Sequence, residues 1–207
     1  MLPHAGQVRQ ALVLGASAVS AHTQRMYRFA ASLLLMVSVS ASLVADQTNE
    51  RLDTLFGLLH ETENPRIGEQ ITRQIWIIWR EVDNENADTL MDKGIHDMRL
   101  QRYDQALITF NKVVEIAPTY AEGWNKRATL LFLMDDYVGS VADIKRTLAL
   151  EPRHFGAWSG LGLIYTHLDN DAVALRAFEQ ALEVNPHLPG ARHNVESIKK
   201  RQQEKLI

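Results

Sequence analysis

Apolar residues recur at helical spacing over most of the chain after residue 50. The three clearest runs outside its middle part are Leu52, Leu55, Phe56 and Leu59; Ile67, Ile71, Ile75, Ile78 and Trp79; and Ala191, Val195 and Ile198. Residues three and four apart share one face of a helix, so each run predicts an amphipathic helix. Asn64-Pro65, between the first two runs, fits a helix cap followed by a first helical residue.

Between these runs the chain repeats itself at an interval of 34 residues. The interval separates the members of two sets, namely Gly94, Ala128 and Gly162, and Pro118, Pro152 and Pro186. A small residue allows two helices to cross closely, at about 8–10 Å between axes. A proline disfavours helical backbone in the residue before it and therefore ends a helix. The pattern predicts three antiparallel helix pairs, each closed by a proline.

The third window resembles the tetratricopeptide-repeat (TPR) family. The matching residues are Trp158, Leu161, Gly162, Tyr165, Ala174, Phe178, Ala181 and Pro186. The second window keeps Trp124, Ala128, Tyr137, Leu148 and Pro152, with Arg127, Ser140 and Thr147 where Leu and Ala are usual. The first keeps Gly94, Tyr103, Ala106, Phe110 and Pro118, with Leu90 at the aromatic position and Lys93 and Asp97 at apolar ones.

The resemblance implies an all-α fold, a TPR superhelical solenoid of antiparallel helix pairs with a divergent N-terminal helix pair and a C-terminal capping helix. The expected segments are a leader over 1–45, the divergent pair over 46–86, repeats over 87–120, 121–154 and 155–188, and the capping helix over 189–207. Gly57 lies 37 residues before Gly94, so the divergent pair is expected to stack on the first repeat as a cap. Trp76 and Trp79 are expected in its core; the alternative is a ligand-stacking pair.

The first 45 residues differ in composition from the rest, because they contain no Asp or Glu. Arg28 followed by the apolar stretch 29–39 is typical of a signal peptide with its core at 26–41, and Ser42 or Asp46 would begin the mature chain. We therefore expect a periplasmic or secreted protein. An uncleaved signal anchor and a mitochondrial presequence are the alternatives.

Composition narrows the possible partners. The chain has 22 basic and 25 acidic residues and a net charge of −3, which does not provide the basic field expected of a nucleic-acid-binding protein. It contains no cysteine, which excludes disulfides, thiol nucleophiles and cysteine metal sites.

No motif for catalysis or for a cofactor is present, neither a glycine-rich phosphate loop nor a Gly-x-Ser-x-Gly nucleophile. His154 and His187 lie in two equivalent inter-repeat turns, without a carboxylate partner in the sequence that would favour a metal site. We expect them to be solvated. The sequence therefore predicts a protein that is not an enzyme and needs no cofactor or metal.

Proteins of the TPR family bind a partner segment on the inner face, which the first helix of each repeat lines. Carried over by position, the resemblance predicts a groove formed by Met91, Asp92, Ile95, Met98, Arg99, Asn125, Lys126, Thr129, Phe132, Leu133, Ser159, Gly160, Leu163, Thr166, His167, His193 and Asn194. Apolar side chains would receive apolar anchors, and Phe132 and Lys126 are expected to be dispensable for folding. The alternative is a solvated face.

The chain resembles the small exported TPR proteins of alphaproteobacteria. The predicted function is that of an adaptor or scaffold that binds a protein or peptide segment as a monomer or small oligomer. The alternative is a structural or assembly subunit of an envelope or oligomeric complex. The Lys and Asn clamp for chaperone tails is absent, because its positions hold mainly Met91, Ile95, Asn125, Ser159 and Leu163.

Overall fold

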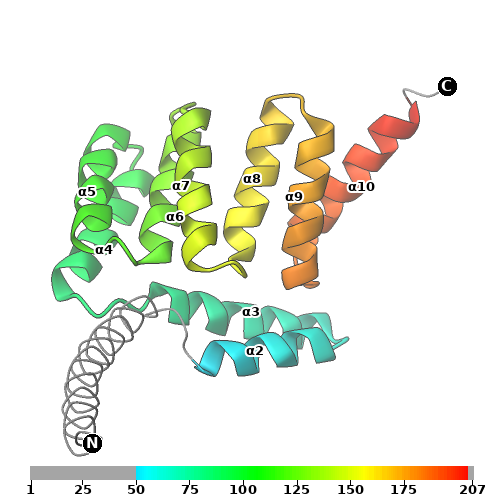
Figure 1. Cartoon of the computed structure of the whole chain (residues 1–207), viewed down its shortest axis with the longest axis horizontal. Coiled ribbons are helices and arrows are strands. Elements are labelled where there is room, and N and C mark those ends of the chain that lie inside the picture. Colours follow the sequence, from blue (N-terminus) through cyan, green and yellow to red (C-terminus); the bar gives the residue numbers. More distant parts are fainter. Residues whose placement is uncertain (1–49, 205–207) are drawn as a thin grey trace, which may run out of the picture. The chain divides into compact units, whose positions relative to one another are not determined.

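A computed structural model describes residues 50–204 of the chain, and these residues form an all-α structure (Figure 1). Its helices are α2 (Glu50–Glu61), α3 (Pro65–Arg80), α4 (Glu85–Arg99), α5 (Tyr103–Ile116), α6 (Ala121–Leu133), α7 (Tyr137–Leu150), α8 (Phe155–His167), α9 (Asp171–Val184) and α10 (Pro189–Glu204). The pairs α4–α5, α6–α7 and α8–α9 are the three predicted repeats, and α10 follows as the last helix. The predicted fold class is confirmed.

A small residue on the first helix of a repeat packs against a large one on the second. A methyl group added at Gly94 would lie 2.6 Å from the Phe110 ring, and one added at Gly162 would lie 2.6 Å from the Phe178 ring. Both phenylalanines are buried. The aromatic ring thus fills the space that the missing side chain leaves, which brings the two helices of the pair close together.

The turns between repeats are fixed by a hydrogen bond that recurs at the 34-residue interval. The indole Nε1 of Trp124 donates to the carbonyl of Pro118 at 2.9 Å, and that of Trp158 donates to Pro152 at 3.0 Å. In α10 the guanidinium of Arg192 makes the equivalent bond to Pro186, at 2.7 Å. The carbonyl of each proline that follows a helix is therefore hydrogen-bonded to a side chain near the start of the next helix.

The first repeat has polar residues at two positions that are apolar in the third repeat. Lys93 and Asp97 form an ion pair along α4, and the Lys93 ammonium also lies 3.5 Å from the hydroxyl of Thr109 on α5. The corresponding third-repeat positions of Lys93 and Asp97 hold Leu161 and Tyr165, which pack in apolar clusters. The departures from the repeat pattern at Lys93 and Asp97 thus form a polar contact between α4 and α5, with Asp97 buried.

The helix pair α2–α3 does not stack on the first repeat, contrary to the sequence-based prediction. It lies across the edge where α6, α8 and α10 begin (Figure 1). Gly57 is exposed, and a methyl group added there would meet nothing within 4 Å, so the close crossing that defines a repeat is missing. The pair instead buries its apolar side, with Trp79 fully buried, against Phe155, the first residue of α8.

Side chains from the inter-repeat turns hold this helix pair in place. The Tyr120 hydroxyl, before α6, donates to the carbonyl of Arg80 at 3.0 Å. Arg153, before α8, forms an ion pair with Asp53 of α2 at 2.6 Å. The pair therefore spans turns that belong to successive repeats.

The third turn, before α10, contacts α2 and α3 through the side chain of His187. Its Nε2 lies 3.2 Å from the carbonyl of Leu59 and 3.0 Å from that of Thr62, at the end of α2. The ring passes over Gly68 of α3, where an added methyl group would lie 2.3 Å from it. The prediction that His187 is a solvated turn histidine is therefore wrong. Its ring connects the turn before α10 to the end of α2, and Gly68 leaves space for it.

The last helix, α10, closes the other end. Ala191, Val195 and Ile198 are buried against α9, and its remaining residues are mainly exposed and polar. The predicted capping helix is confirmed. Within residues 50–204, no helix is both long enough and apolar enough to cross a membrane.

The glycine–phenylalanine crossing predicts different effects at two glycines. Gly162→Val should lower the free energy of unfolding by about 1–3 kcal/mol, because the new side chain overlaps the Phe178 ring. The control Gly57→Ala lies in open space on a helix and should raise it by about 0.5–1 kcal/mol. Urea unfolding of both variants measures the difference. An unchanged midpoint for Gly162→Val would show that the helices tolerate separation there.

Candidate functional site

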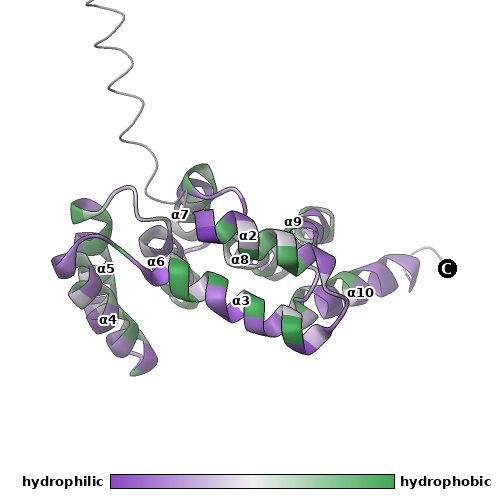
Figure 2. Ribbon diagram, turned by 90° about the horizontal axis from the view of Figure 1, so that it is seen from below, coloured by the Kyte–Doolittle hydropathy of each residue, from purple (hydrophilic) through white to green (hydrophobic). Residues whose placement is uncertain are grey.

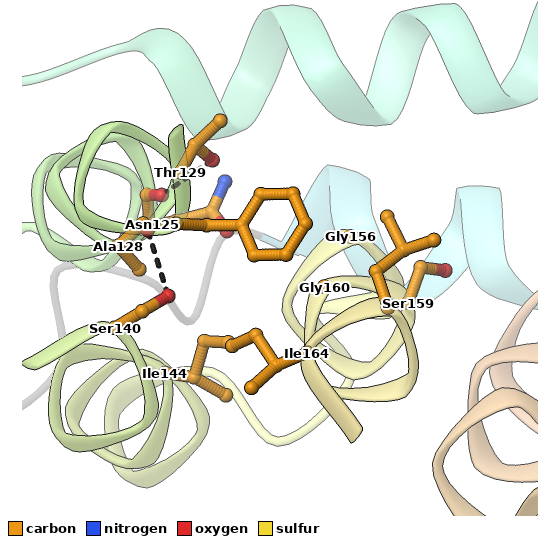
Figure 3. A pocket seen from close by; sticks show the side chains of 11 residues that line it. Asn125, Ala128, Thr129, Ser140, Ile144, Gly156, Ser159, Gly160 and Ile164 are labelled. Atoms are coloured by element: carbon orange, nitrogen blue, oxygen red, sulfur yellow. Dashed lines mark hydrogen bonds between the residues drawn. The ribbon is translucent and has the colours of Figure 1, made fainter. Parts of the chain in front are cut away.

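A pocket of about 180 Å³ opens between α6 and α8, with α7 behind it (Figure 3). The lining residues are Asn125, Ala128, Thr129, Phe132, Ser140, Ile144, Gly156, Ser159, Gly160, Leu163 and Ile164. The first helices of the second and third repeats thus supply its two sides, and Ser140 and Ile144 of α7 its base. This is the inner face on which the sequence predicted a groove.

The hydroxyl groups around the pocket already donate hydrogen bonds to backbone carbonyls. Thr129 donates to the carbonyl of Asn125 at 2.9 Å, Ser159 to that of Phe155 at 2.8 Å, and Ser140 to that of Ala128 at 2.8 Å. These bonds turn the donors toward the backbone and leave methyl, methylene and ring groups on much of the wall. The pocket is therefore suited to an apolar side chain, with Leu163 partly exposed at 40% beside it.

The structure brings together only part of the predicted groove. Six of its residues line the pocket: Asn125, Thr129, Phe132, Ser159, Gly160 and Leu163. Met91 is fully buried in the core of the first repeat, so the prediction that it lines the groove is wrong. It faces α5 because it lies one turn before Gly94, on the crossing side of α4. Ile95 and Met98 are half-buried and pack against the same core.

The remaining predicted residues lie outside this pocket. Asp92 forms an ion pair with Arg80 at 2.7 Å, and Thr166 and Asn194 donate to backbone carbonyls of their own helices. Arg99, Leu133, His167 and His193 are exposed, as is Asp92. The residues of the predicted groove therefore form separate groups. Those that line this pocket all belong to the second and third repeats.

Phe132 also belongs to an aromatic group at one end of the pocket. Its ring centroid lies 5.1 Å from that of His167, edge to face, and 5.8 Å from that of Tyr137. The Tyr137 hydroxyl donates to Asp135 at 2.7 Å. Phe132 is half-buried, so the prediction that it can be removed without effect on folding does not fit its packing against Ala128, Ile144 and their neighbours.

Near the opposite end of the pocket lies a buried charged group that sequence reasoning missed. Glu122 and His154 are both fully buried, and the carboxylate lies 3.1 Å from Nε2 of the imidazole. Asn125 donates to the same carboxylate at 2.7 Å, and the Lys126 ammonium lies 2.9 Å from its other oxygen. Lys126 is therefore not a free groove cation, contrary to the prediction.

The hydrogen bonds define the charge state of this group. His154 Nδ1 accepts from the backbone N–H of Ala157 at 3.0 Å, which caps α8. Since an N–H group can only donate, the imidazole proton lies on Nε2 and is directed at Glu122. Burial alone would raise the pKa of Glu122, but the His154 hydrogen bond and the Lys126 charge outweigh it and hold that pKa below its ordinary value of 4.5.

Helix α3 covers this group. The indole of Trp79 stacks on the His154 ring with centroids 4.1 Å apart and an interplanar angle of 9°. The neighbouring Trp76 ring lies under the Lys126 ammonium at 5.4 Å and against Gly156, where an added methyl group would lie 2.5 Å from it. The two tryptophans are thus packing residues, as predicted, and the alternative of a ligand-stacking pair is not supported. Through Gly156, Trp76 also borders the pocket.

One signal in the sequence pointed to His154. It takes the position that Tyr120 holds one repeat earlier and Leu188 one repeat later, so two large neighbours at the same position indicate a covered site. Glu122 gave no such signal, because Gly156 and Gly190 stand at its equivalent positions. Among the residues from 50 to 204, no three His, Asp or Glu side chains come together in a way that would hold a metal ion.

The state of Glu122 predicts how stability depends on pH. Its pKa is lower in the folded chain, so ionised Glu122 stabilises the fold above about pH 4.5, and this contribution is lost as the pH falls through the lower, folded value. Glu122→Gln should be less stable at pH 7, by on the order of 1–3 kcal/mol, because Lys126 loses its partner. Between pH 6 and 3, the free energy of unfolding of Glu122→Gln should also fall by less than that of the wild type. Urea unfolding at several pH values tests this, and parallel curves for the two proteins would contradict it.

The comparisons agree with this architecture. Residues 95–120 and 155–188 match models of the tetratricopeptide repeat. A TPR repeat-containing protein of Rhizobium etli is 35% identical over 153 residues, which cover 72% of this chain and 74% of that protein.

Solved structures share the fold. The first TPR of Spaghetti (RPAP3), bound to an HSP90 peptide of sequence SRMEEVD, has a TM-score of 0.56 and 23% identity and covers 59% of this chain and 97% of that one. The Sgt2 TPR domain from Aspergillus fumigatus has a TM-score of 0.56 and 22% identity, over 59% of this chain and 82% of that one. With the repeats, the inner-face pocket and the Rhizobium relative together, the chain belongs to the tetratricopeptide-repeat family.

Proposed function

We propose that the protein is an adaptor that binds a segment of another polypeptide on its inner face, and that it is not an enzyme. The observation that carries this proposal is the apolar pocket between α6 and α8, whose nearby hydroxyl groups are already bonded to the backbone. Such a pocket offers burial to an apolar side chain and no general acid, base or nucleophile for a reaction. A neighbour of the same fold has been solved with a peptide bound, which supports this mode of action.

The partner segment that we propose carries an apolar anchor residue rather than an acidic tail. The HSP90 peptide of the RPAP3 structure ends in Glu-Glu-Val-Asp and presents several carboxylates. In this chain Lys126, the neighbour of the pocket residue Asn125, already neutralises the buried Glu122 and lies over Trp76. Drawing Lys126 to a ligand would leave Glu122 buried without it, which costs several kcal/mol on the order of a broken buried ion pair. An acidic tail is therefore a poor fit.

We further propose that the protein acts in the bacterial periplasm, after removal of the leader. This proposal is supported by residues 1–45, which lack acidic side chains and contain the signal-like stretch 26–41; they lie outside the described residues. The absence of cysteine from the chain is compatible with an oxidising compartment.

The groove proposal is tested by comparing two leucines of similar exposure. Leu163 borders the pocket at 40% exposure, whereas Leu133 is 44% exposed and does not line it. With a photo-reactive amino acid at each position in the native host, the Leu163 variant should cross-link a defined polypeptide and the Leu133 variant should not. Equal labelling from both positions, or none from Leu163, would refute binding at this pocket.

The same pair of positions gives a binding test. Leu163→Asp should reduce capture of that cross-linked polypeptide by about tenfold or more, since a desolvated apolar contact at an interface centre is worth about 2 kcal/mol. Leu133→Asp is the matched control and should leave capture unchanged. Both variants should keep the wild-type helical circular-dichroism spectrum, because both side chains are partly solvated.

The proposed location has its own test. N-terminal sequencing of the protein isolated from its native host should begin at Ser42, or at Asp46 if the second site is used. Isolated protein that retains residues before Phe29 would exclude cleavage and favour a cytosolic or anchored form.

A further inference from the structure

A second apolar surface lies on the other side of α7 from the inner-face pocket. Ser140 and Ile144 of α7 face that pocket, whereas Val138, Val141, Ala142 and Lys145 line a different hollow of about 530 Å³. Its other lining residues are Asp135, Asp136, Tyr137, Tyr165 and Leu168. Figure 2 shows α7 and α9 on one side of α6 and α8, with α3 on the other. This second surface, the α7 face, therefore belongs to the outer layer of the solenoid.

The α7 face is apolar at its centre. Val138 is 83% exposed, the highest value among the large apolar residues that the structure describes, and Leu168 is 49% exposed. Val138, Val141, Ala142 and Lys145 are spaced by three or four residues and so share one side of the helix. An exposed apolar patch with a polar rim is a common feature of protein–protein interaction sites.

Charges of opposite sign flank this apolar centre. Asp135 and Asp136 precede the first turn of α7, and Lys145 lies on the same side about 13 Å further along, at 1.5 Å per residue. Within residues 50–204, no cation forms an ion pair with either aspartate and no carboxylate pairs with Lys145. The midpoint between Asp136 and Lys145 falls at Ser140 and Val141. A surface with acid at one end, base at the other and apolar residues between them is complementary to itself under a two-fold rotation.

We propose that the α7 face is the interface of a homodimer in which the α7 helices of two copies pack antiparallel. Lys145 of one copy then faces Asp136 of the other. In this register position 138 of each copy lies opposite position 143 of the other, so the Val138 side chain packs beside the small Ala142. The two-fold axis passes between Ser140 and Val141.

This arrangement has a functional consequence. Because the interface lies behind the inner-face pockets, the dimer leaves both pockets open. One dimer can then hold two partner segments, which gives a scaffold with avidity for partners that carry two such segments. The dimer itself does not depend on the proposed binding function, since a protein with an unused groove would still associate through α7.

The test is the mass of the purified protein over a concentration series, by sedimentation or light scattering. The wild type should approach twice the 23.4 kDa chain mass, less any removed leader. Val138→Asp should raise the dimer dissociation constant by at least about tenfold, because it places one new carboxylate of each copy in the apolar centre of the interface. The control Ile108→Asp changes a 59% exposed residue on α5 and should leave the dimer intact. Both substitutions are at solvated positions, so both variants should melt near the wild-type temperature.

The chain has no cysteine, so introduced cysteines report the packing directly. The double variant V138C/A142C should form a covalent dimer on mild oxidation, whereas V138C alone should not, because the two Val138 positions are offset along the antiparallel helices. A monomer at all concentrations overturns the proposal. So does a dimer that survives Val138→Asp, or one that Ile108→Asp disrupts equally. If V138C alone cross-links while the double variant gains nothing, the antiparallel register is wrong.

Discussion

The close crossing of a glycine on one helix with a phenylalanine on the next is the constraint from which the rest of the architecture follows. It is made at Gly94 with Phe110 and at Gly162 with Phe178. Since the crossing recurs at a fixed interval, the helices α5, α7 and α9 end on the same side of the molecule, each followed by a proline. This alignment produces an edge of equivalent turns, and the N-terminal helix pair binds to that edge. Without regular crossings there would be no continuous edge for α2–α3 to span.

The N-terminal pair makes the solenoid a closed unit rather than an open stack. In a simple solenoid each repeat contacts only its neighbours, so its stability is close to a sum of local terms. Here α2–α3 reaches the turn before α6, the turn before α8 and the turn before α10. These contacts couple the repeats to one another through a third element. We expect the repeats to unfold together for this reason.

The same edge contains the buried Glu122–His154 pair, which connects stability to the inner face. The imidazole caps α8, binds Glu122 and is covered by Trp79, so one side chain joins α3, α6 and α8. The pair also engages Lys126 and Asn125, which leaves the nearby pocket without a free cation of its own. The interactions that stabilise this edge therefore also determine which charged groups remain available at the pocket. The outer α7 face is separate from this network, so the proposed self-association would leave the proposed binding pocket open.

The sequence by itself determined the repeats, their pairing and the helix ends, because these depend on neighbours no more than 34 residues apart. Gly162, Phe178 and Pro186 are local signals, and the structure places them as their spacing predicts. Only the tertiary structure decided where α2–α3 lies, that His154 and His187 are buried or bonded, that Met91 is core, and that Lys126 is paired. The physical reason is separation along the chain: His187 meets Leu59 across 128 residues and Arg153 meets Asp53 across 100. Helical periodicity states which face of a helix is apolar, but not which distant surface covers it.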